Sequence, residues 1–473
     1  MRALENRYLR LFYDIGVFAL GTVLAKAIQF VLMPLYTSYM STEMYGTAEL
    51  INNLSELFLP IVTLCIYEAA FRFAVEKRFS HTVIAKAAAR LLGVSLALGA
   101  VTAYVGWRVL GYPYAFHLLL IVYAYAVRMT AAFYVRGKGL SRVFALSGVV
   151  NAIALALCNV LLIIVVPLGV DGYLLSIGCA YLATAVYLVA FGGIHRDLAG
   201  RERPDRQVAR TLLAYSAPLI FYNVLYWVNT IAGRYVLLWF TNEETVGVYV
   251  AAIKIAAVIN MLQQAVYVAF QLSASREFSN ADRTSYYARI IDAFSGAYFA
   301  LGALVICTTP LLAALTLKND FIAAERFLPV IILAAVVNCV SSLVGTMYMT
   351  YMSTGSIVPV SVMGAAINVA ACLILVPRMG VWGVCIATLV SYVAQLVYKI
   401  VDVRRLSGLV IRGRLIAANF AALTAQALCM GIEPLRAMRL HYLIAGAVVL
   451  GNGYGLRAEA TALVAKLQRR GKR

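Results

Sequence analysis

Apolar stretches of about 20 residues recur from end to end of the sequence, and this feature constrains the fold most strongly. A helix of that length crosses the hydrocarbon core of a bilayer. Of the 473 residues, 63% are hydrophobic and only 13% are charged, with a mean hydropathy of +0.84, whereas a soluble chain carries about 25% charged residues. The stretches do not alternate as barrel strands do. We therefore predict an all-α polytopic membrane protein.

About fourteen spans are predicted, and the last two are expected to form a helical pair.

The start of the chain is charged and the first apolar stretch is too long for a signal peptide, so no cleavable signal is expected. All eight cysteines lie in apolar stretches and form no CxxC, which indicates small membrane side chains rather than disulfides or metal ligands. The spans lie near 12–38, 46–71, 83–107, 115–135, 143–166, 172–193, 212–240, 247–272, 288–309, 327–351, 357–377, 381–402, 414–432 and 440–456.

Lysine and arginine are distributed unequally between the two sets of loops. With the N-terminus inside, the inner segments hold 28 of the 40 basic residues, the outer loops hold 6, and 6 lie within spans. The positive-inside rule therefore predicts that both termini are cytoplasmic. The net charge of +19 would suggest nucleic-acid binding in a soluble chain. Here the topology and contact with anionic lipid explain it, and no nucleic-acid partner is expected.

Two motifs recur along the chain. STEMYG (41–46) aligns with NEETVG (242–247) at an offset of 201, and VPLGVDG (166–172) resembles VPRMGVWG (376–383). Six spans separate the copies, so the repeat is parallel, and such repeats pack about an axis along the membrane normal. We predict a pseudo-two-fold pair of six-helix lobes at 1–193 and 212–405, a basic cytoplasmic linker at 194–211, and an extra helix pair with a basic tail at 406–473.

Polar side chains within spans are candidates for function, because each costs several kcal/mol unless it meets a partner or water. Glu49, Asn52, Asn53 and Glu56 are spaced 0, 3, 4 and 7, which places them on one helical face. Interhelical hydrogen bonding is the alternative role of each single amide. The candidate cationic substrate-binding site comprises Lys26, Arg90, Arg128, Arg234 and Lys254. The candidate polar lining or ion-coupling set comprises Gln29, Glu49, Asn52, Asn53, Glu56, Asn223, Tyr226 and Gln264.

The cations of this set favour a shared water-filled path. Lys26, Arg128, Arg234 and Lys254 come from spans of both halves, and the mid-membrane acids are too few to pair them all. Glu49 and Glu56 are possible partners of Lys26. Arg90, near the inner end of its span, either snorkels to the surface or meets an anionic headgroup.

Several classes of function are excluded by motifs that the sequence lacks. It contains no GxxxxGK[ST] motif, so ATP does not drive it directly. The four histidines show no ligand spacing, and no nucleophile motif is present, so we expect no enzyme, no metal and no cofactor. The outer loops are too short for the catalytic domain of a glycan polymerase or ligase.

Two segments carry a resemblance to a known family. FALGTVLAKAIQFVLMPLYTSYMSTEMYGTAEL (18–50), with its core from Pro34 to Gly46, and ILVPRMGVWGVCIATLVSYVAQLVYK (374–399), with Gly380 and Gly383, resemble polysaccharide transporters. These belong to the multidrug/oligosaccharidyl-lipid/polysaccharide (MOP) flippase superfamily. The closest resemblance is to the branch that flips lipid-linked O-antigen, capsule or exopolysaccharide units.

The resemblance implies two lobes forming a V, a cationic cavity, and alternating access that moves a polyprenyl-pyrophosphate-linked oligosaccharide across the bacterial inner membrane. It implies coupling to a proton or sodium gradient in many members, and a groove for the lipid tail at the last two spans in fourteen-span relatives. Expected partners are the lipid-linked glycan, membrane lipids, and the glycan polymerase and glycosyltransferases of the same pathway. A peptidoglycan-precursor flippase and a cation-coupled multidrug exporter are the alternatives within the superfamily, the latter disfavoured by the excess of buried Lys and Arg.

Overall fold

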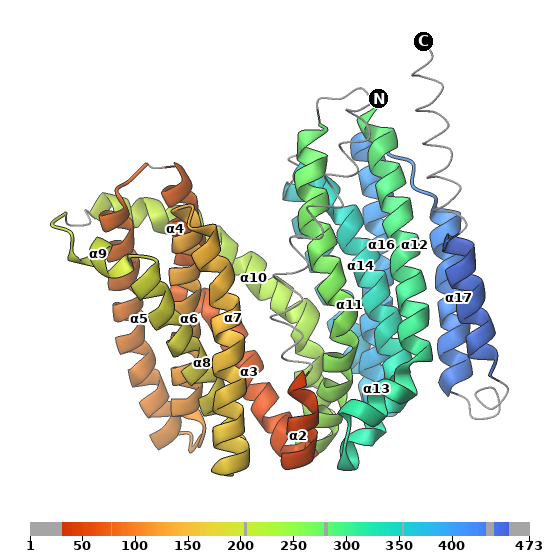
Figure 1. The fold of residues 1–473 in the computed structure, drawn as a ribbon, viewed down its shortest axis with the longest axis horizontal. Helices are drawn as coiled ribbons and strands as arrows, with labels where there is room; N and C mark the ends of the chain where they lie inside the picture. The colour runs from red at the N-terminus through yellow and green to blue at the C-terminus, as the bar shows by residue number, and fades with distance from the viewer. Residues whose placement is uncertain are drawn as a thin grey trace. The chain divides into compact units, whose positions relative to one another are not determined.

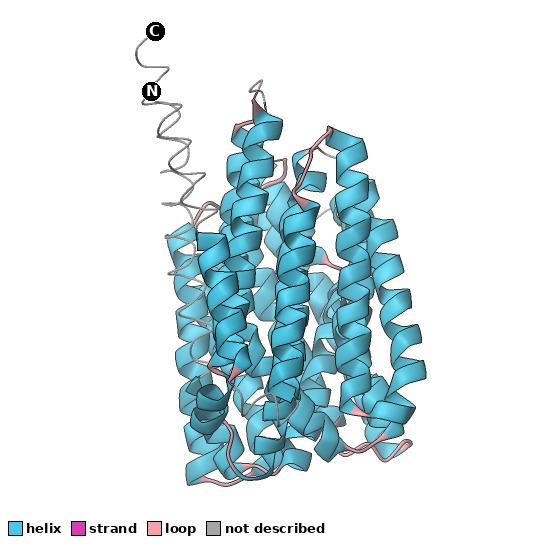
Figure 2. Cartoon of the chain, turned by 90° about the vertical axis from the view of Figure 1, so that its right-hand side faces the viewer, coloured by secondary structure: helices cyan, strands magenta, loops and turns pink. Residues whose placement is uncertain are grey.

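The computed structural model confirms an all-α membrane protein. It describes residues 31–76, 78–202, 206–278, 282–351, 354–431 and 439–453, and every regular element in these ranges is a helix (Figures 1 and 2). Among these residues, nine helices are long and apolar enough to cross a membrane, or ten when one bent pair is taken as a single span. The described residues form two compact units, one ending at Tyr235 and the other beginning at Val236.

The first unit is built around α6, which packs against five neighbouring helices, α3, α4, α5, α7 and α8. Alanines dominate the core where α4, α5 and α6 meet, because small side chains let membrane helices approach closely. The helices of this unit are α2 (Met33–Tyr39), α3 (Thr42–Thr63), α4 (Ile66–Glu76), α5 (His81–Arg108), α6 (Ala115–Gly137), α7 (Ser141–Asn159), the π-helix η1 (Val160–Val165), α8 (Gly169–Phe191), α9 (Ile194–Ala199) and most of α10 (Arg206–Phe240).

The second unit is built around α14, which packs against α11, α12, α16 and α17. The predicted last pair of helices is joined by a hydrogen bond from the Asn452 amide to the Asn419 side chain, 2.9 Å long. The helices are α11 (Glu243–Arg276), α12 (Arg283–Cys307), α13 (Thr309–Thr316), η2 (Asn319–Phe327), α14 (Leu328–Thr350), η3 (Thr354–Ser356), α15 (Ile357–Met379), α16 (Val381–Ser407), α17 (Gly413–Gly431) and Leu440–Gly453.

The first repeated motif starts one helix in each unit by the same capping interaction. Ser41 precedes α3 and accepts a hydrogen bond from the Met44 amide at 3.1 Å. Asn242 precedes α11 and accepts from the Thr245 amide at 2.9 Å. Both caps satisfy a backbone donor that the first helical turn leaves unpaired. In the first unit the helix begins directly after the cap, so α3 starts at Thr42, before the predicted start of the span 46–71.

The second repeated motif brings a helix close to the one before it. Gly169 and Gly380 both have positive φ, +59° and +52°, where a side chain would be strained. Three residues farther on, a Cβ at Gly172 would lie 2.3 Å from the Leu162 carbonyl oxygen, and one at Gly383 would lie 2.7 Å from the backbone around Leu375. The repeat therefore encodes a turn followed by a close backbone contact.

The predicted span 46–71 is bent in the structure. α3 and α4 meet at 55°, and Leu64 and Cys65 at the break have φ of 47° and 53°. The break follows Pro60, the proline inside α3. Ser95 donates a 2.7 Å hydrogen bond to the Val62 carbonyl, which supplies a partner next to the interrupted helix. Irregular backbone within a membrane span requires such a partner from the protein itself.

Candidate functional site

The predicted polar face of α3 is buried at one end and exposed at the other. Glu49 and Asn53 are only 1% and 3% exposed. Asn52 is half-buried, and Glu56 is exposed. The spacing of these residues therefore identified one face, and the packing of the first unit selects Glu49 and Asn53 as its buried part.

Glu49 lies among tyrosines. The Tyr173 hydroxyl of α8 donates a hydrogen bond to Glu49 Oε1. The Tyr173 ring meets the Tyr36 ring edge-on at a centroid distance of 5.0 Å and the Tyr45 ring at 6.0 Å. The carboxyl group is thus hydrogen-bonded to one member of a group of three contacting tyrosines from α2, α3 and α8. Its predicted pairing with Lys26 stays a prediction, because Lys26 lies outside the described residues.

Asn53 is the point at which α10 meets α3. Arg234 donates from one terminal nitrogen to Asn53 Oδ1 at 2.6 Å, and the Trp227 indole donates to the Asn53 carbonyl at 2.9 Å. The Arg234 Nε and Asn53 Nδ2 atoms are buried, and neither has a hydrogen-bond partner among the described residues. Arg234 also forms no ion pair with a carboxylate in the described part of the chain.

Arg128 of α6 is another half-buried cation of this unit. Its guanidinium lies over the Tyr181 ring at 5.1 Å and over the Tyr125 ring at 5.9 Å. These two rings are stacked at 4.9 Å. Arg128 Nε is buried and finds no hydrogen-bond partner within the described ranges. Cation–π contacts hold the group in place but do not neutralise its charge.

The two arginines belong to the same unit, Arg128 on α6 and Arg234 on α10. We call Glu49, Asn53, Arg128 and Arg234 the polar cluster of the first unit. Half-buried cations with unfilled donor sites are suited to an anionic group that accepts several hydrogen bonds, such as a phosphate.

The other predicted residues fall elsewhere or stay untested. Arg90 is exposed on α5, and Tyr226 is 61% exposed on α10. Asn223 donates to the Leu219 carbonyl at 2.8 Å. In the second unit, Lys254 is half-buried and Gln264 is exposed. Gln29, like Lys26, lies outside the described residues, so a path shared by the two halves stays a prediction.

One half-buried cation and several partners were not among the predicted site residues. Lys399 donates to Ser341 Oγ at 2.9 Å within the second unit, and the candidate cationic set does not include it. Its position inside the predicted span 381–402 was the signal that would have identified it. Trp227 and Tyr173 were missed because their roles depend on helices that are distant in sequence.

The chain matches one family model and several solved structures of membrane transporters. A family model described as polysaccharide biosynthesis protein matches residues 11–271. An outward-facing multidrug resistance MATE family transporter of the MOP superfamily has a TM-score of 0.60 at 15% identity, over 84% of this chain and 96% of that one. No curated protein matches the sequence.

Two further solved structures share the fold. A MOP superfamily transporter from Pyrococcus furiosus, described as having a binding pocket of reverse polarity, has a TM-score of 0.58 at 15% identity, over 83% and 96% of the two chains. A mutant of the Vibrio cholerae MATE transporter VcmN has a TM-score of 0.57 at 13% identity, over 86% and 98%. At these identities the likeness establishes the fold alone.

Proposed function

Because the chain belongs to the polysaccharide biosynthesis protein family and has the fold of MOP superfamily transporters, we propose that it is a flippase for surface polysaccharide. Its substrate is an oligosaccharide repeat unit linked to a polyprenyl pyrophosphate. It moves this unit from the cytoplasmic to the outer leaflet of the bacterial inner membrane by alternating access. Both termini then lie in the cytoplasm, as the positive-inside rule requires.

One observation supports this substrate class above the others. Arg128 and Arg234 lie in membrane-spanning helices, each with a buried Nε that has no hydrogen-bond partner among the described residues. A cation in a span is retained only where a partner or a function offsets its cost. A pyrophosphate supplies both the negative charge and the acceptor oxygens that the two guanidinium groups need.

Glu49 provides the group that a coupling ion requires. It is a buried carboxyl within a span, held by the Tyr173 hydroxyl. Binding of a proton or a sodium ion would remove its charge, and the charge of Glu49 in turn affects the arginines of the polar cluster. We propose that this exchange of charge links the ion gradient to binding and release of the pyrophosphate.

Two alternatives within the superfamily differ in testable ways. A peptidoglycan-precursor flippase would use the same arginines, because its lipid carrier also ends in a pyrophosphate. A cation-coupled drug exporter is favoured by a different observation, namely that Glu49 is hydrogen-bonded to Tyr173, whose ring contacts two further tyrosines, since aromatic rings and a carboxylate attract cations. The charges of Arg128 and Arg234 in the same unit would repel such a substrate.

The experiment is a deletion strain complemented with the wild-type gene or its variants. Surface glycan is measured together with the leaflet in which the lipid-linked repeat unit resides. We expect loss of polymer, with the intermediate stranded on the cytoplasmic face, and rescue by the wild type. Normal polymer accompanied by a defect in drug resistance or in peptidoglycan synthesis would contradict the proposal and select one of the alternatives.

A further inference from the structure

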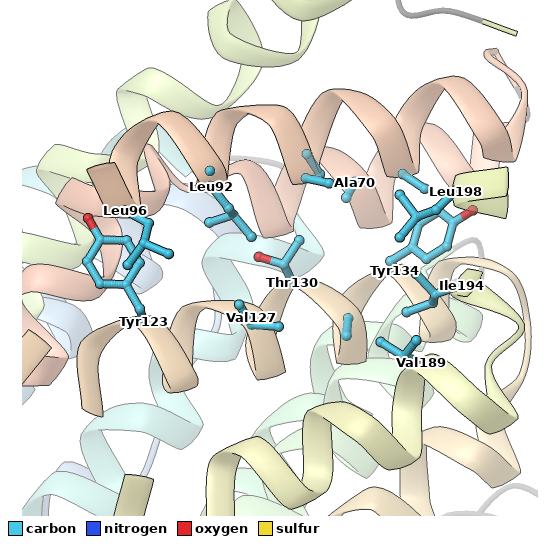
Figure 3. Close-up of a pocket in the computed structure, with 15 residues that line it drawn as sticks. Ala70, Leu92, Leu96, Tyr123, Val127, Thr130, Tyr134, Val189, Ile194 and Leu198 are labelled. Carbon is cyan, nitrogen blue, oxygen red and sulfur yellow. The ribbon is translucent and has the colours of Figure 1, made fainter. Parts of the chain in front are cut away.

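An apolar groove of about 310 Å³ lies within the first unit, between α5, α6 and the region around α9 (Figure 3). Leu96 and Tyr123 lie at one end, Tyr134 and Leu198 lie at the other, and Thr130 lies between them. The volume is at the lower limit for sites that hold small ligands. We call this feature the α5–α6 groove, and the polar cluster described above does not include it.

The groove is open on the exposed side of the helices. Leu96, Val127 and Leu198 line it, and each is more than a third exposed. A Cβ at Gly93, another lining residue, would meet nothing within 4 Å. Since α5 and α6 are candidate membrane spans, what fills an apolar opening on this face is lipid hydrocarbon rather than water.

The length of the groove matches one leaflet. On α6 it extends from Tyr123 to Tyr134, which at 1.5 Å per residue is roughly 17 Å. One leaflet contributes about half of a hydrocarbon core that is roughly 30 Å thick. A single acyl chain therefore lies along the groove without crossing the midplane.

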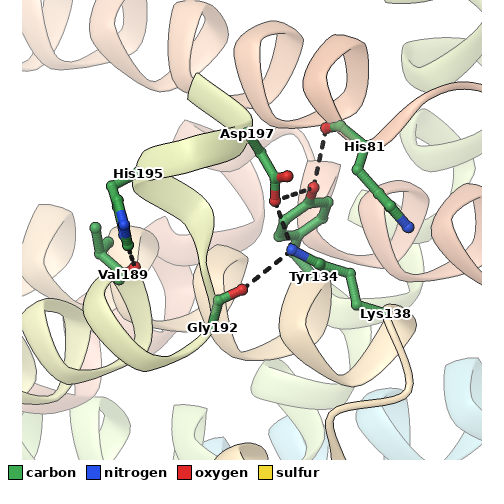
Figure 4. Close-up of polar contacts among 7 residues, drawn as sticks. All are labelled: His81, Tyr134, Lys138, Val189, Gly192, His195 and Asp197. Atoms are coloured by element: carbon green, nitrogen blue, oxygen red, sulfur yellow. Dashed lines mark hydrogen bonds and ion pairs between the residues drawn. The ribbon is translucent and has the colours of Figure 1, made fainter. Parts of the chain in front are cut away.

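The end of the groove beside α9 is closed by a set of polar contacts (Figure 4). The Tyr134 hydroxyl lies 2.9 Å from both the His81 carbonyl oxygen and Asp197 Oδ2. Lys138 pairs with the same Asp197 oxygen at 2.6 Å and donates to the Gly192 carbonyl at 3.1 Å. These contacts hold α9 where its Ile194 side chain lines the groove.

Thr130 indicates what kind of lipid enters. It is 7% exposed, lines the groove, and its hydroxyl has no hydrogen-bond partner in the described part of the chain. The hydroxyls of the two lining tyrosines are already hydrogen-bonded, Tyr123 to Ser95 and Tyr134 to Asp197. A pure hydrocarbon tail gives Thr130 no acceptor, whereas a glycerolipid carries ester carbonyls where its chains meet the headgroup.

Charges around the groove select the headgroup. Arg90 follows the lining residue Ala89 on α5, and Arg196 lies between Ile194 and Leu198 on α9; both arginines are exposed. The neighbouring acids are engaged, because Asp197 pairs with Lys138 and Glu202 accepts from Ser80. The wall and cap of the groove therefore carry a net positive charge, which attracts anionic lipid.

We propose that the α5–α6 groove binds one acyl chain of an anionic glycerophospholipid from the leaflet beside α9, with Thr130 donating to an ester carbonyl. This is the leaflet that the positive-inside rule assigns to the cytoplasm. The bound lipid fills the space between α5 and α6 and so supports their packing. The site does not depend on the substrate that the polar cluster transports.

The test is native mass spectrometry of the purified full-length protein after extensive detergent washing, with the retained lipid identified. Gly93→Leu fills the groove, and Gly446→Leu is the matched control, because a Cβ at Gly446 also meets nothing within 4 Å. We expect wild type and control to retain phosphatidylglycerol or cardiolipin, and Gly93→Leu to lose most of it. Equal retention by Gly93→Leu, or retention of a polyprenyl lipid in place of the glycerophospholipid, would overturn the proposal.

A second measurement keeps the proposal testable if Gly93→Leu fails to fold. Phosphatidylglycerol with a photoreactive acyl chain is added to phosphatidylethanolamine vesicles that contain the wild-type protein or Thr130→Val. Adducts are expected on the α5 and α6 residues that line the groove, and fewer are expected with Thr130→Val. Adducts spread evenly over the exposed helices, or equal labelling by a zwitterionic probe, would contradict the assignment.

Discussion

Arg234 gives one hydrogen bond to Asn53 and keeps its Nε buried without a partner in the described residues, so its charge is the property to test. Arg234→Gln is expected to slow flipping about 10- to 100-fold, because a charge-assisted hydrogen bond contributes about 1.5–3 kcal/mol. Arg234→Lys keeps the charge and is expected to retain part of the activity. The measurement is transport in vesicles of equal protein content.

Arg136→Gln is the matched control for the buried arginines. Arg136 lies on α6, as Arg128 does, and also contacts two aromatic rings, but it is exposed at the end of the helix. We expect near-normal flipping in this variant and strong loss in Arg128→Gln. Equal loss in both variants would mean that the change acts through folding rather than through a buried charge.

Glu49→Gln tests ion coupling. The amide keeps the size of the carboxyl and still accepts a hydrogen bond from Tyr173, but it carries no charge at any pH. We expect transport down the substrate gradient to persist, while stimulation by a proton or sodium gradient is lost. Glu43→Gln, at the exposed start of the same helix, is expected to respond to the gradient normally. Gradient-driven transport by Glu49→Gln would rule out this carboxyl as the coupling group.

At the scale of single residues, the sequence predicted which polar side chains matter but not which side chains they contact. The spacing of Glu49 and Asn53 placed both on one face of a helix, and the structure buries both. Tyr173, which binds Glu49, is 124 residues away in the chain. Such a contact depends on how α3 and α8 pack, and a periodicity within one helix carries no information about that.

At the scale of elements, the repeated glycines make a specific prediction. Gly172→Ala and Gly383→Ala each place a methyl group within 2.3–2.7 Å of the backbone of the preceding helix, where flexible side-chain movement cannot relieve the clash. We expect each to lower the free energy of unfolding by about 1–3 kcal/mol. Thermal unfolding in detergent measures this.

Gly93→Ala is the control for these two variants. Its added methyl group meets nothing within 4 Å, and alanine favours a helix interior over glycine by about 0.8–1.0 kcal/mol. Unchanged or higher stability is therefore expected. Normal stability of Gly172→Ala and Gly383→Ala would show that the close backbone contacts do not constrain the turn.

The long apolar helices of the described residues were predictable, and two local features were not. Long apolar stretches fix where helices lie, because the bilayer requires every backbone group to be paired within the segment. The segment containing α9 is polar enough to be predicted as a linker, and it becomes a helix through the contacts of Asp197 with Tyr134 and Lys138. The bend between α3 and α4 follows Pro60, which marks the helix as one that can kink, but no sequence rule places the break itself at Leu64 and Cys65.

At the scale of the whole molecule, the 28-to-6 distribution of basic residues predicts the orientation. A green fluorescent protein fused after Arg473 is expected to fluoresce, since it folds in the cytoplasm. Alkaline phosphatase fused after Gly111, in a predicted outer loop, is expected to be active. If the C-terminal fusion does not fluoresce and the phosphatase fusion is inactive, the predicted orientation in the membrane is reversed. The proposed direction of transport would then be reversed as well.

We have proposed that the protein flips a pyrophosphate-linked glycan by means of Arg128 and Arg234, whose Nε atoms are buried. The most direct measurement uses the purified protein in proteoliposomes that contain a lipid-linked oligosaccharide, with the glycan in the outer leaflet detected by a membrane-impermeant enzyme. We predict that the wild type makes the protected half of the glycan accessible, that Arg234→Gln does so about 10- to 100-fold more slowly, and that Arg136→Gln behaves as the wild type. If Arg234→Gln flips as fast as the wild type, or if the wild type leaves the glycan in place while exporting a cationic dye, the account is contradicted.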